Sequence, residues 1–339
     1  MLNIEVSTDS IRIGERFAVA FQRTLRIPDD GRTYPLPPGL GRFPLYRVAD
    51  FAERLPPEWG ERGGVFIPMY QREALWLAFS AAPWKPNAVQ IAVGRINAIS
   101  GEHDQARLHA DPQNYVVCPE QPWLDGIHTG QGAIRQFVAM PLGLGYTIEA
   151  SLTGTEQFGG IQITVFEPKP GKFPDEPPVK LAAGPERLAG WRPGAAQAMG
   201  LGAGGLMRQK VYPDPYGVGT WDPEDYGRIF VHILNSAQFR EVTGVEAPPT
   251  PIDATTYTTH GLPWFDLYDE AKADIPPSER LAQARTVAER DAERGQPTGA
   301  DESFEVLPGQ IRKLDRDASG AMPSESTPPD AERNTPTGG

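Results

Sequence analysis

The clearest pattern of hydrophobic and polar positions lies in residues 130–167, where glycines separate three short runs. Residues 134–140 are mostly apolar, residues 146–152 alternate polar with apolar side chains, and residues 157–166 end in a β-branched run. Alternation with a period of two suits a sheet, because successive side chains of a strand point to opposite faces. We therefore predict three strands in this stretch.

Similar runs occur earlier in the chain. Residues 11–27 predict one strand or a bent pair of strands, and residues 64–70 and 88–99 predict further strands. Residues 71–80, QREALWLAFS, are ambiguous, because leucine and phenylalanine alternate while Glu, Ala and Leu also favour helix. The run is short and has proline-rich flanks, so we favour a strand.

The second half of the chain contains fewer regular patterns. Residues 226–244 begin with the strand-like RIFVHIL and predict a short helix closed by Gly244. Residues 278–294 predict the clearest helix, with Ser278 as its cap and a thin apolar face. Beyond Gly295 the chain is rich in Pro, Ser, Thr, Gly and charge, a composition typical of disorder.

These patterns divide the chain into three regions. Residues 1–168 form a predicted β-rich core, residues 169–275 a mixed irregular region packing on it, and residues 276–339 a short helix with a disordered acidic and polar tail. Short alternating strands must each bury one face, which favours two packed antiparallel sheets. The expected fold is mainly β, with a sandwich-like core and an irregular α/β C-terminal portion.

Composition narrows the functional classes. The 339 residues include 36 glycines and 36 prolines, which favours many short elements over long helices. The net charge of −12 disfavours nucleic acid and anionic membrane surfaces as partners. The sequence shows no apolar run long enough for a membrane span and no secretion signal pattern. The single cysteine, Cys118, excludes an internal disulfide framework, so we expect a soluble cytoplasmic protein.

The histidines provide the candidates for a metal site. His103 and His109 lie among acidic residues in GEHDQARLHADP, and imidazole with carboxylate is a donor set for divalent transition ions. Their spacing matches no metal motif, so a solvated polar loop is the preferred interpretation. His232, inside FVHIL, is interpreted as a strand residue hydrogen-bonded at a sheet face.

Nucleophile and cofactor motifs give no support for an enzyme. Cys118 follows a β-branched run and precedes proline, which favours a small buried side chain over an activated thiolate. Gly200, Gly202 and Gly205 have the G-x-G-x-x-G spacing of dinucleotide-binding loops, but no strand is evident before them. We interpret residues 199–207 as a packed or flexible backbone turn, and we predict no cofactor.

Four carboxylates beside aromatic residues are the remaining catalytic candidates: Glu73, Asp125, Glu149 and Asp266. Aromatic rings stack on sugars while acids bind hydroxyl groups, and a pair of acids is able to hydrolyse a glycosidic bond. Two of these carboxylates facing each other in one aromatic-lined cleft would favour an enzyme. Their dispersal among solvated positions would favour a structural role.

Two motifs that join Pro-Trp to an acidic residue suggest a binding surface. QPWLDGI contributes Trp123 and Asp125, and LPWFDLYDE contributes Trp264, Phe265 and Tyr268. Trp and Tyr are enriched at protein interfaces. The alternative is that the second motif holds the C-terminal region against the β core.

The sequence thus predicts a binding or assembly protein without its own catalytic site, with another protein as its partner. The alternative is a carboxylate-based carbohydrate-active enzyme or a lectin-like sugar-binding domain. Whether the protein is an enzyme stays open.

Overall fold

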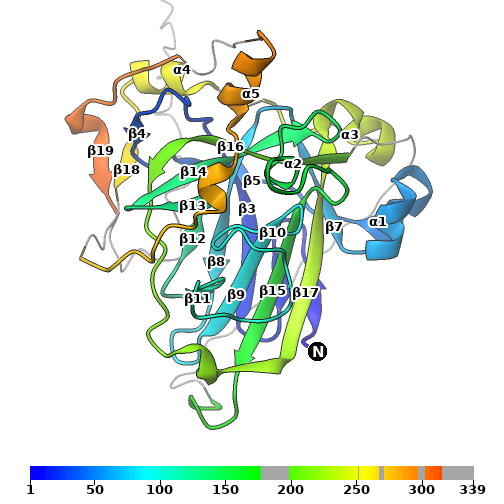
Figure 1. The fold of residues 1–339 in the computed structure, drawn as a ribbon. Coiled ribbons are helices and arrows are strands. Elements are labelled where there is room, and N and C mark those ends of the chain that lie inside the picture. The colour runs from blue at the N-terminus through cyan, green and yellow to red at the C-terminus, as the bar shows by residue number, and fades with distance from the viewer. Residues whose placement is uncertain (177–197, 251, 267–270, 297–301, 315–339) are drawn as a thin grey trace, which may run out of the picture.

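The computed structural model describes residues 1–176, 198–250, 252–266, 271–296 and 302–314. Strands dominate these residues, and every helix is short (Figure 1). Antiparallel pairing prevails in one extended network of strands, and a separate pair forms a second, small sheet. The prediction of a mainly β fold is confirmed.

The extended network has two layers. The first layer runs in order through antiparallel pairs of β1 (Ile4–Val6), β2 (Ile11–Ile13), β3 (Phe17–Thr24), β8 (Ala74–Ser80), β14 (Ala133–Pro141) and β16 (Ala198–Arg208). The second runs through β11 (Val116–Cys118), β9 (Asn87–Val93), β15 (Ile161–Pro168), β17 (Trp221–Asn235), β7 (Val65–Met69) and β6 (Tyr46–Arg47). A short pairing between the start of β16 and the end of β17 joins the layers at one corner.

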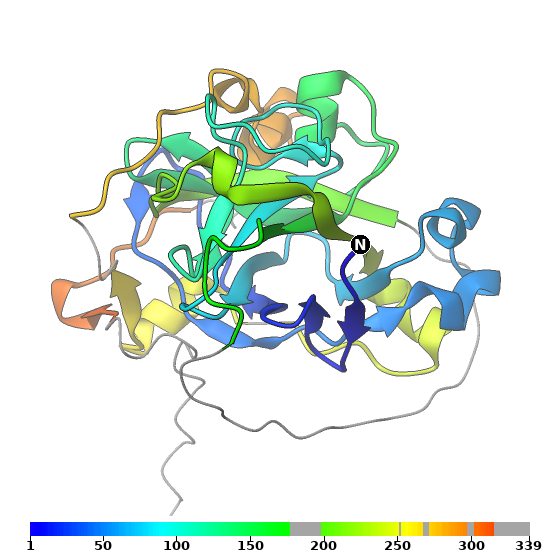
Figure 2. The same cartoon turned by 90° about the horizontal axis from the view of Figure 1, so that it is seen from below.

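Alternate residues of both layers fill one core. Each major strand contributes every second side chain, as the period of a strand requires. These core residues are Phe17, Val19 and Phe21 of β3, Leu75, Leu77 and Phe79 of β8, Val89, Ile91 and Val93 of β9, Ile161, Ile163 and Val165 of β15, and Ile229, Val231 and Ile233 of β17. Figure 2 shows the dark blue N-terminal strands across this core from the lime strand β17. The layers therefore form the sandwich-like core that the alternation predicts.

The strand predictions in the first part of the chain are confirmed. Residues 11–27 form the bent pair β2 and β3, and residues 64–70 contain β7. The ambiguous residues 71–80 contain β8, whose Leu75, Leu77 and Phe79 face the core. Residues 88–99 lie in β9 and in β10 (Ile96–Asn97). Here the burial of one face outweighed the helix propensity of Glu and Ala.

The predicted strand at residues 146–152 is wrong, because the chain forms helix α2 (Ile148–Thr153) there. The Thr147 side chain accepts a hydrogen bond from the Ala150 backbone N–H, and Gly154 ends the helix in the left-handed conformation with φ of 75°. Both are ordinary helix boundary signals. The apparent period of two in six residues was too short to distinguish a strand from a helix.

The interpretation of residues 199–207 as a turn is also wrong. These residues lie in β16, which pairs with β14 along nearly its whole length. The glycines allow neighbouring backbone to approach the strand: a Cβ atom at Gly202 would lie 2.9 Å from the Tyr146 carbonyl oxygen. Because β16 and β17 are core strands, the core extends beyond the boundary expected at residue 168.

The end of β17 leads into helix α3 (Ser236–Thr243), which Gly244 closes in the left-handed conformation, as predicted. The single helix predicted at residues 278–294 is wrong in its extent. Ser278 does accept a hydrogen bond from the Leu281 N–H, but extended backbone at Ala284 separates a short 3-10 helix, η3 (Leu281–Gln283), from α5 (Val287–Glu293). Helix α5 begins at its own capping box, formed by Thr286 and Glu289.

Within the predicted tail, residues 302–314 include a strand that composition did not predict. This strand, β19 (Ile311–Lys313), pairs in parallel with β18 (Trp264–Asp266) to form the small second sheet. The remaining elements are β4 (Thr33–Tyr34), β5 (Gly39–Arg42), η1 (Val48–Arg54), α1 (Pro57–Arg62), β12 (Trp123–Leu124), β13 (Gly126–Gly130), η2 (Val218–Thr220), α4 (Ala254–Thr259) and η5 (Pro308–Gln310). No helix in the described ranges is long and apolar enough to cross a membrane.

Candidate binding cavity

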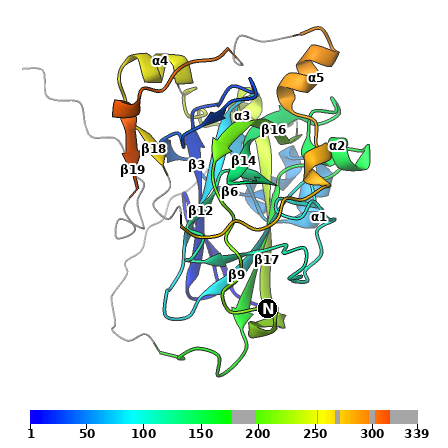
Figure 3. The same ribbon diagram turned by 60° about the vertical axis from the view of Figure 1, so that its left-hand side comes forward.

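A cavity of about 390 Å³ lies where the C-terminal segments meet the edge of the core. Its walls come from the end of β3, the β7–β8 turn, the start of α4 and the residues around Phe304. Figure 3 shows α4, β18 and β19 together on one side of the core, opposite α1 and α2. A second cavity, of about 770 Å³, lies beside the N-terminus and has none of the predicted site residues in its lining.

The β7–β8 turn positions the central residues of the first cavity. Arg72 has a φ of 70°, a left-handed conformation that is uncommon for a residue other than glycine. The turn is held by a hydrogen bond from the Glu73 N–H to the Tyr70 carbonyl, and the Arg72 N–H donates to Ala139 of β14. A strained residue fixed at a cavity wall is a feature that functional sites often share.

Glu73 lies in the cavity wall as half of a buried ion pair. Arg23 of β3 donates from Nε and Nη2 to Glu73 Oε1, at 2.8 and 2.5 Å, and the Tyr70 N–H donates to Oε2 at 2.9 Å. Burial raises the pKa of Glu73 above its ordinary value, while Arg23 and the Tyr70 N–H oppose that shift. Both carboxylate oxygens are thus occupied within the protein.

Arg72 connects the cavity to α5. Its guanidinium donates to both oxygens of Asp291 at 2.7 and 2.8 Å, and the Tyr146 hydroxyl donates to the same carboxylate at 2.7 Å. Burial acts to raise the pKa of Asp291, but these donors outweigh it and hold that pKa below its ordinary value. Such a bidentate pair is directional as well as strong. The cavity geometry therefore depends on the position of α5.

The remaining polar groups of the lining include Asp253, Arg26, Thr24 and Thr255. Asp253 caps α4 by accepting from the N–H and hydroxyl of Thr256, both at 2.7 Å, and these bonds lower its pKa. Apolar wall comes from Ile252, Ala254 and Phe304. A lining of paired charges and hydroxyl groups beside a larger apolar wall suits a molecule that carries polar groups on an apolar frame.

Asp125, the second catalytic candidate, is buried in the core and does not line either cavity described above. Its backbone N–H donates to Gln209 Oε1 at 3.0 Å, and Gln209 Nε2 donates to Asp125 Oδ2 at 2.8 Å. Burial raises the pKa of Asp125 to about 7, and the bond from Gln209 opposes the rise only in part. The structure thus pairs this carboxyl with an amide rather than with another acid.

Glu149, the third candidate, lies in α2 and holds a backbone turn. Its carboxylate accepts hydrogen bonds from the backbone N–H groups of Gln157, Phe158 and Gly159, at distances from 2.8 to 3.2 Å. Asp266, the fourth candidate, pairs with Arg208 at 3.1 Å. The four carboxylates therefore have separate partners, and only Glu73 lines the cavity.

The predicted aromatic binding residues lie at different depths. Trp264 and Phe265 of β18 are buried against a cluster that includes Tyr34 and Tyr257, and Phe265 exchanges two backbone hydrogen bonds with Leu36. Trp123 is partly buried against the same cluster. Tyr268 lies outside the described residues. A partner surface at these residues stays a prediction, while their contacts hold β18 against the core.

The histidines are also dispersed. His103 forms an isolated bridge with Ile96, and the neighbouring Asp104 pairs with Arg228. Across the described part of the chain, no three His, Cys, Asp or Glu side chains gather closely enough to hold a metal ion. His232 Nε2 donates to the Gly63 carbonyl at 3.0 Å, so the prediction of a hydrogen-bonded strand residue is confirmed. Cys118 is buried in β11, and burial raises the pKa of its thiol.

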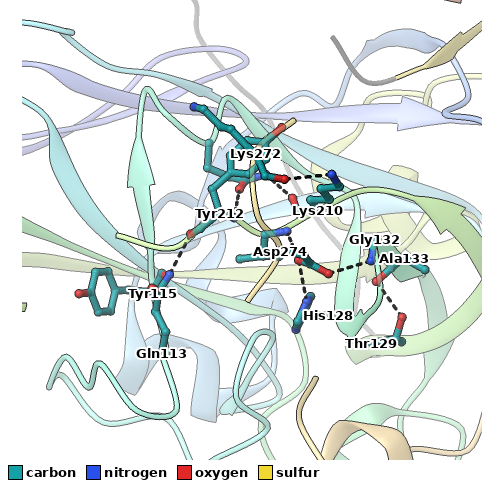
Figure 4. Close-up of polar contacts among 12 residues, drawn as sticks. Gln113, Tyr115, His128, Thr129, Gly132, Ala133, Lys210, Tyr212, Lys272 and Asp274 are labelled. Carbon is teal, nitrogen blue, oxygen red and sulfur yellow. Dashed lines mark hydrogen bonds and ion pairs between the residues drawn. The ribbon is translucent and has the colours of Figure 1, made fainter. Parts of the chain in front are cut away.

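Sequence reasoning missed a buried histidine–aspartate pair. His128 Nε2 of β13 lies 3.1 Å from Asp274 Oδ1, and the Asp274 carboxylate also accepts from the N–H groups of Gly132 and Val211 (Figure 4). The partners are 146 positions apart, so no local motif connects them. Burial acts to raise the pKa of Asp274, but the bonds from His128 and Gly132 hold it below its ordinary value.

Further contacts surround this pair. Lys210 Nζ donates to the Lys272 carbonyl, and Gln113 Nε2 donates to the carbonyls of Tyr115 and Tyr212 (Figure 4). Lys272 in turn pairs with Glu120. We name residues 271–296 the strap, because Lys272, Asp274 and Asp291 of this segment attach it to the core.

Comparison with known proteins adds no functional information. No family model matches the chain, and searches of curated proteins and of solved structures found no match either.

Proposed function

We propose that this protein binds a small polar molecule, rich in hydroxyl groups, in the cavity around Glu73 and Arg72, and that it has no catalytic site of its own. The observation that carries the proposal is the lining of that cavity. Fixed donors and acceptors and an apolar wall surround about 390 Å³, a volume within the range of small-molecule sites.

The two central charged residues of the lining are paired with residues of the protein, which favours a neutral ligand over an ion. Arg72 is neutralised by Asp291, and Glu73 by Arg23. A neutral polyhydroxyl molecule is able to bond to such pairs without leaving a buried charge unpaired. A sugar is the simplest ligand of this kind. The proposal therefore follows the alternative prediction from the sequence, a sugar-binding domain.

The acids of the lining argue for binding rather than hydrolysis. A glycosidase needs one carboxyl group to donate a proton and a second to act as base or nucleophile. The Glu73 carboxylate is bonded to Arg23, and Asp253 is bonded to the start of α4. Neither of these two acids is poised to exchange a proton with a bound molecule, and the third acid of the lining, Glu302, is exposed to solvent.

A cavity-filling substitution tests the proposal. Ile252 lines the cavity and is 49% exposed, whereas Val245 has the same exposure outside it. A panel of mono- and disaccharides is titrated by calorimetry into the wild-type chain, Ile252→Trp and Val245→Trp. We expect at least one sugar to bind the wild type and Val245→Trp, and to lose about 10-fold or more in affinity with Ile252→Trp.

Two results would contradict the proposal. Binding unchanged in Ile252→Trp, or absent from the wild type across the panel, would remove the cavity as the site. Turnover of nitrophenyl glycosides that disappears in Glu73→Gln would favour the enzyme instead.

A further inference from the structure

Three arginines gather on the outer face of the second layer, away from the cavity. Arg228 lies on β17, Arg95 lies at the turn between β9 and β10, and Arg62 ends α1. Two phenylalanines separate them: the ring of Phe158 lies under Arg62 and Arg95, at 4.8 and 5.1 Å, and that of Phe230 under Arg228 at 5.5 Å. We name these five residues the arginine–phenylalanine cluster.

The cluster extends along β17 as a column of flat groups. Phe230 stacks on His232 with ring centroids 6.1 Å apart, and His232 stacks on Trp59 at 4.3 Å. Arg228, Phe230 and His232 are two residues apart on one strand, so their side chains point to the same face. All five cluster residues are partly exposed, so solvent reaches this face.

Positive charge exceeds negative charge within the cluster. Asp104 pairs with Arg228 and offers only its backbone carbonyl to Arg95, at 3.3 Å. Arg62 donates to the carbonyls of Gln157 and Phe158. The nearby Glu149 carboxylate is occupied by backbone N–H groups. Among the described residues, neither Arg62 nor Arg95 has a carboxylate partner.

Two donors of the cluster are unused. The Nε atoms of Arg95 and Arg228 are buried and have no hydrogen-bond partner within the described ranges. A buried donor without an acceptor is costly, and the cost is greater for a charged group. Burial lowers the pKa of Arg228, and the positive charge of the nearby Arg95 lowers it further.

From this arrangement we propose that the arginine–phenylalanine cluster binds an oxyanion attached to a planar ring, such as a phosphorylated or carboxylated heterocycle. The oxyanion would accept from the partly exposed guanidinium groups of Arg62 and Arg95, which have no carboxylate partner among the described residues, since guanidinium groups suit phosphate and carboxylate. The ring would stack beside Phe158 or Phe230. The net charge of −12 disfavours a long polyanion and favours a small one.

Titration with inorganic phosphate, adenosine monophosphate and benzoate tests this site and separates the two oxyanions. Each probe is followed through the guanidinium N–H signals of Arg62 and Arg95 in the full chain by nuclear magnetic resonance. We expect the signals of these two arginines to shift on saturable binding, and adenosine monophosphate to bind about 3- to 10-fold more tightly than phosphate. Benzoate binding alone would identify a carboxylate ligand.

Variants make the test specific. Arg95→Gln should weaken binding about 10-fold or more, because it removes a charge-assisted donor. Arg12→Gln, at an exposed position on β2, makes the same change in charge and should leave binding unchanged. Phe158→Leu keeps an apolar side chain without the ring, and should abolish the advantage of adenosine monophosphate over phosphate.

Two outcomes would overturn the proposal. One is the absence of binding by all three probes up to about 10 mM in the wild type. The other is an equal loss of binding in Arg95→Gln and Arg12→Gln, which would indicate only a general effect of net charge.

Discussion

The two-layer core and the strap are held by different forces. The core is assembled from alternate apolar residues of the major strands, such as Phe21, Leu77 and Ile163. The strap has a few apolar anchors, but polar contacts such as Arg72–Asp291 and His128–Asp274 fix its position. Burial of apolar surface does not depend on pH, whereas ion pairs do. We infer that apolar burial in the core sets the global stability of the protein. The geometry of the cavity depends instead on ion pairs between the core and the strap.

The largest expected effect is in the core. Phe21 is fully buried, so Phe21→Ala removes a ring and leaves a cavity that the sandwich cannot fill. We expect the free energy of unfolding to fall by about 3–5 kcal/mol in urea denaturation at neutral pH. The exposed Arg12→Ala serves as the control and should change it by less than about 0.5 kcal/mol. A loss for Phe21→Ala no larger than for the strap variant below would break the comparison.

A smaller effect is expected in the strap. Asp291→Ala removes the carboxylate that accepts from Arg72 and from the Tyr146 hydroxyl, at an expected cost of about 1–3 kcal/mol. Hydrogen exchange should accelerate in residues 271–296 more than in β9 or β15. Glu293 is the matched control, because its carboxylate is 41% exposed and pairs with Arg290 at the surface. Glu293→Ala should have little effect on either measurement. Uniform acceleration through the core in Asp291→Ala would contradict a separate role for the strap.

The smallest expected effect is the change in folding stability with pH that Asp125 causes. Asp125 in the core has its pKa raised from 3.8 to about 7, so the folded state binds more protons than the unfolded state between these values. Its contribution to stability therefore falls as the pH rises from 4 to 7. Asp125→Asn should thus stabilise the protein at pH 7 by about 1 kcal/mol or more, and this gain should shrink towards pH 4.

The strap carboxylates have the opposite sign. The pKa values of Asp274 and Asp291 lie below 3.8, so their contribution is present above that pH and is lost as the pH falls through the lowered values. Unfolding of wild type and Asp125→Asn in urea between pH 3 and pH 7 checks both signs. A gain for Asp125→Asn that is independent of pH would show that the carboxyl is not the titrating group.

Much of the sandwich was predictable, because a strand that buries one face must repeat its apolar residues with a period of two. Residues 88–99 show this period over several positions, with Val89, Ile91 and Val93 in the core. Residues 146–152 show the period of two over too few positions to identify a strand. The capping residues Thr147 and Gly154 are the better evidence, and they indicate the helix that forms there. In β16 the glycines have no side chain, so apolar and polar residues do not alternate along the strand. The sequence therefore does not reveal this strand, although it lies in the centre of its layer.

The candidate sites were predictable only in part. Glu73 was a candidate because it stands near Trp76, yet its partner Arg23 lies on another strand 50 residues away. His128 and Asp274 are farther apart still along the chain, and no motif beside either residue indicates the other. The same holds for Arg62, Arg95 and Arg228, which come from a helix, a turn and a strand.

By itself, the sequence determined the class of the fold, several of the core strands and the acidic character of the protein. These properties depend on local periodicity and composition, which each segment carries within itself. Only the tertiary structure decided the cavity, the attachment of the strap and the arginine–phenylalanine cluster. Each of these features brings together segments that are far apart in the chain. The register of the strands and the packing of other segments against them decide which residues meet, and no single segment encodes that information.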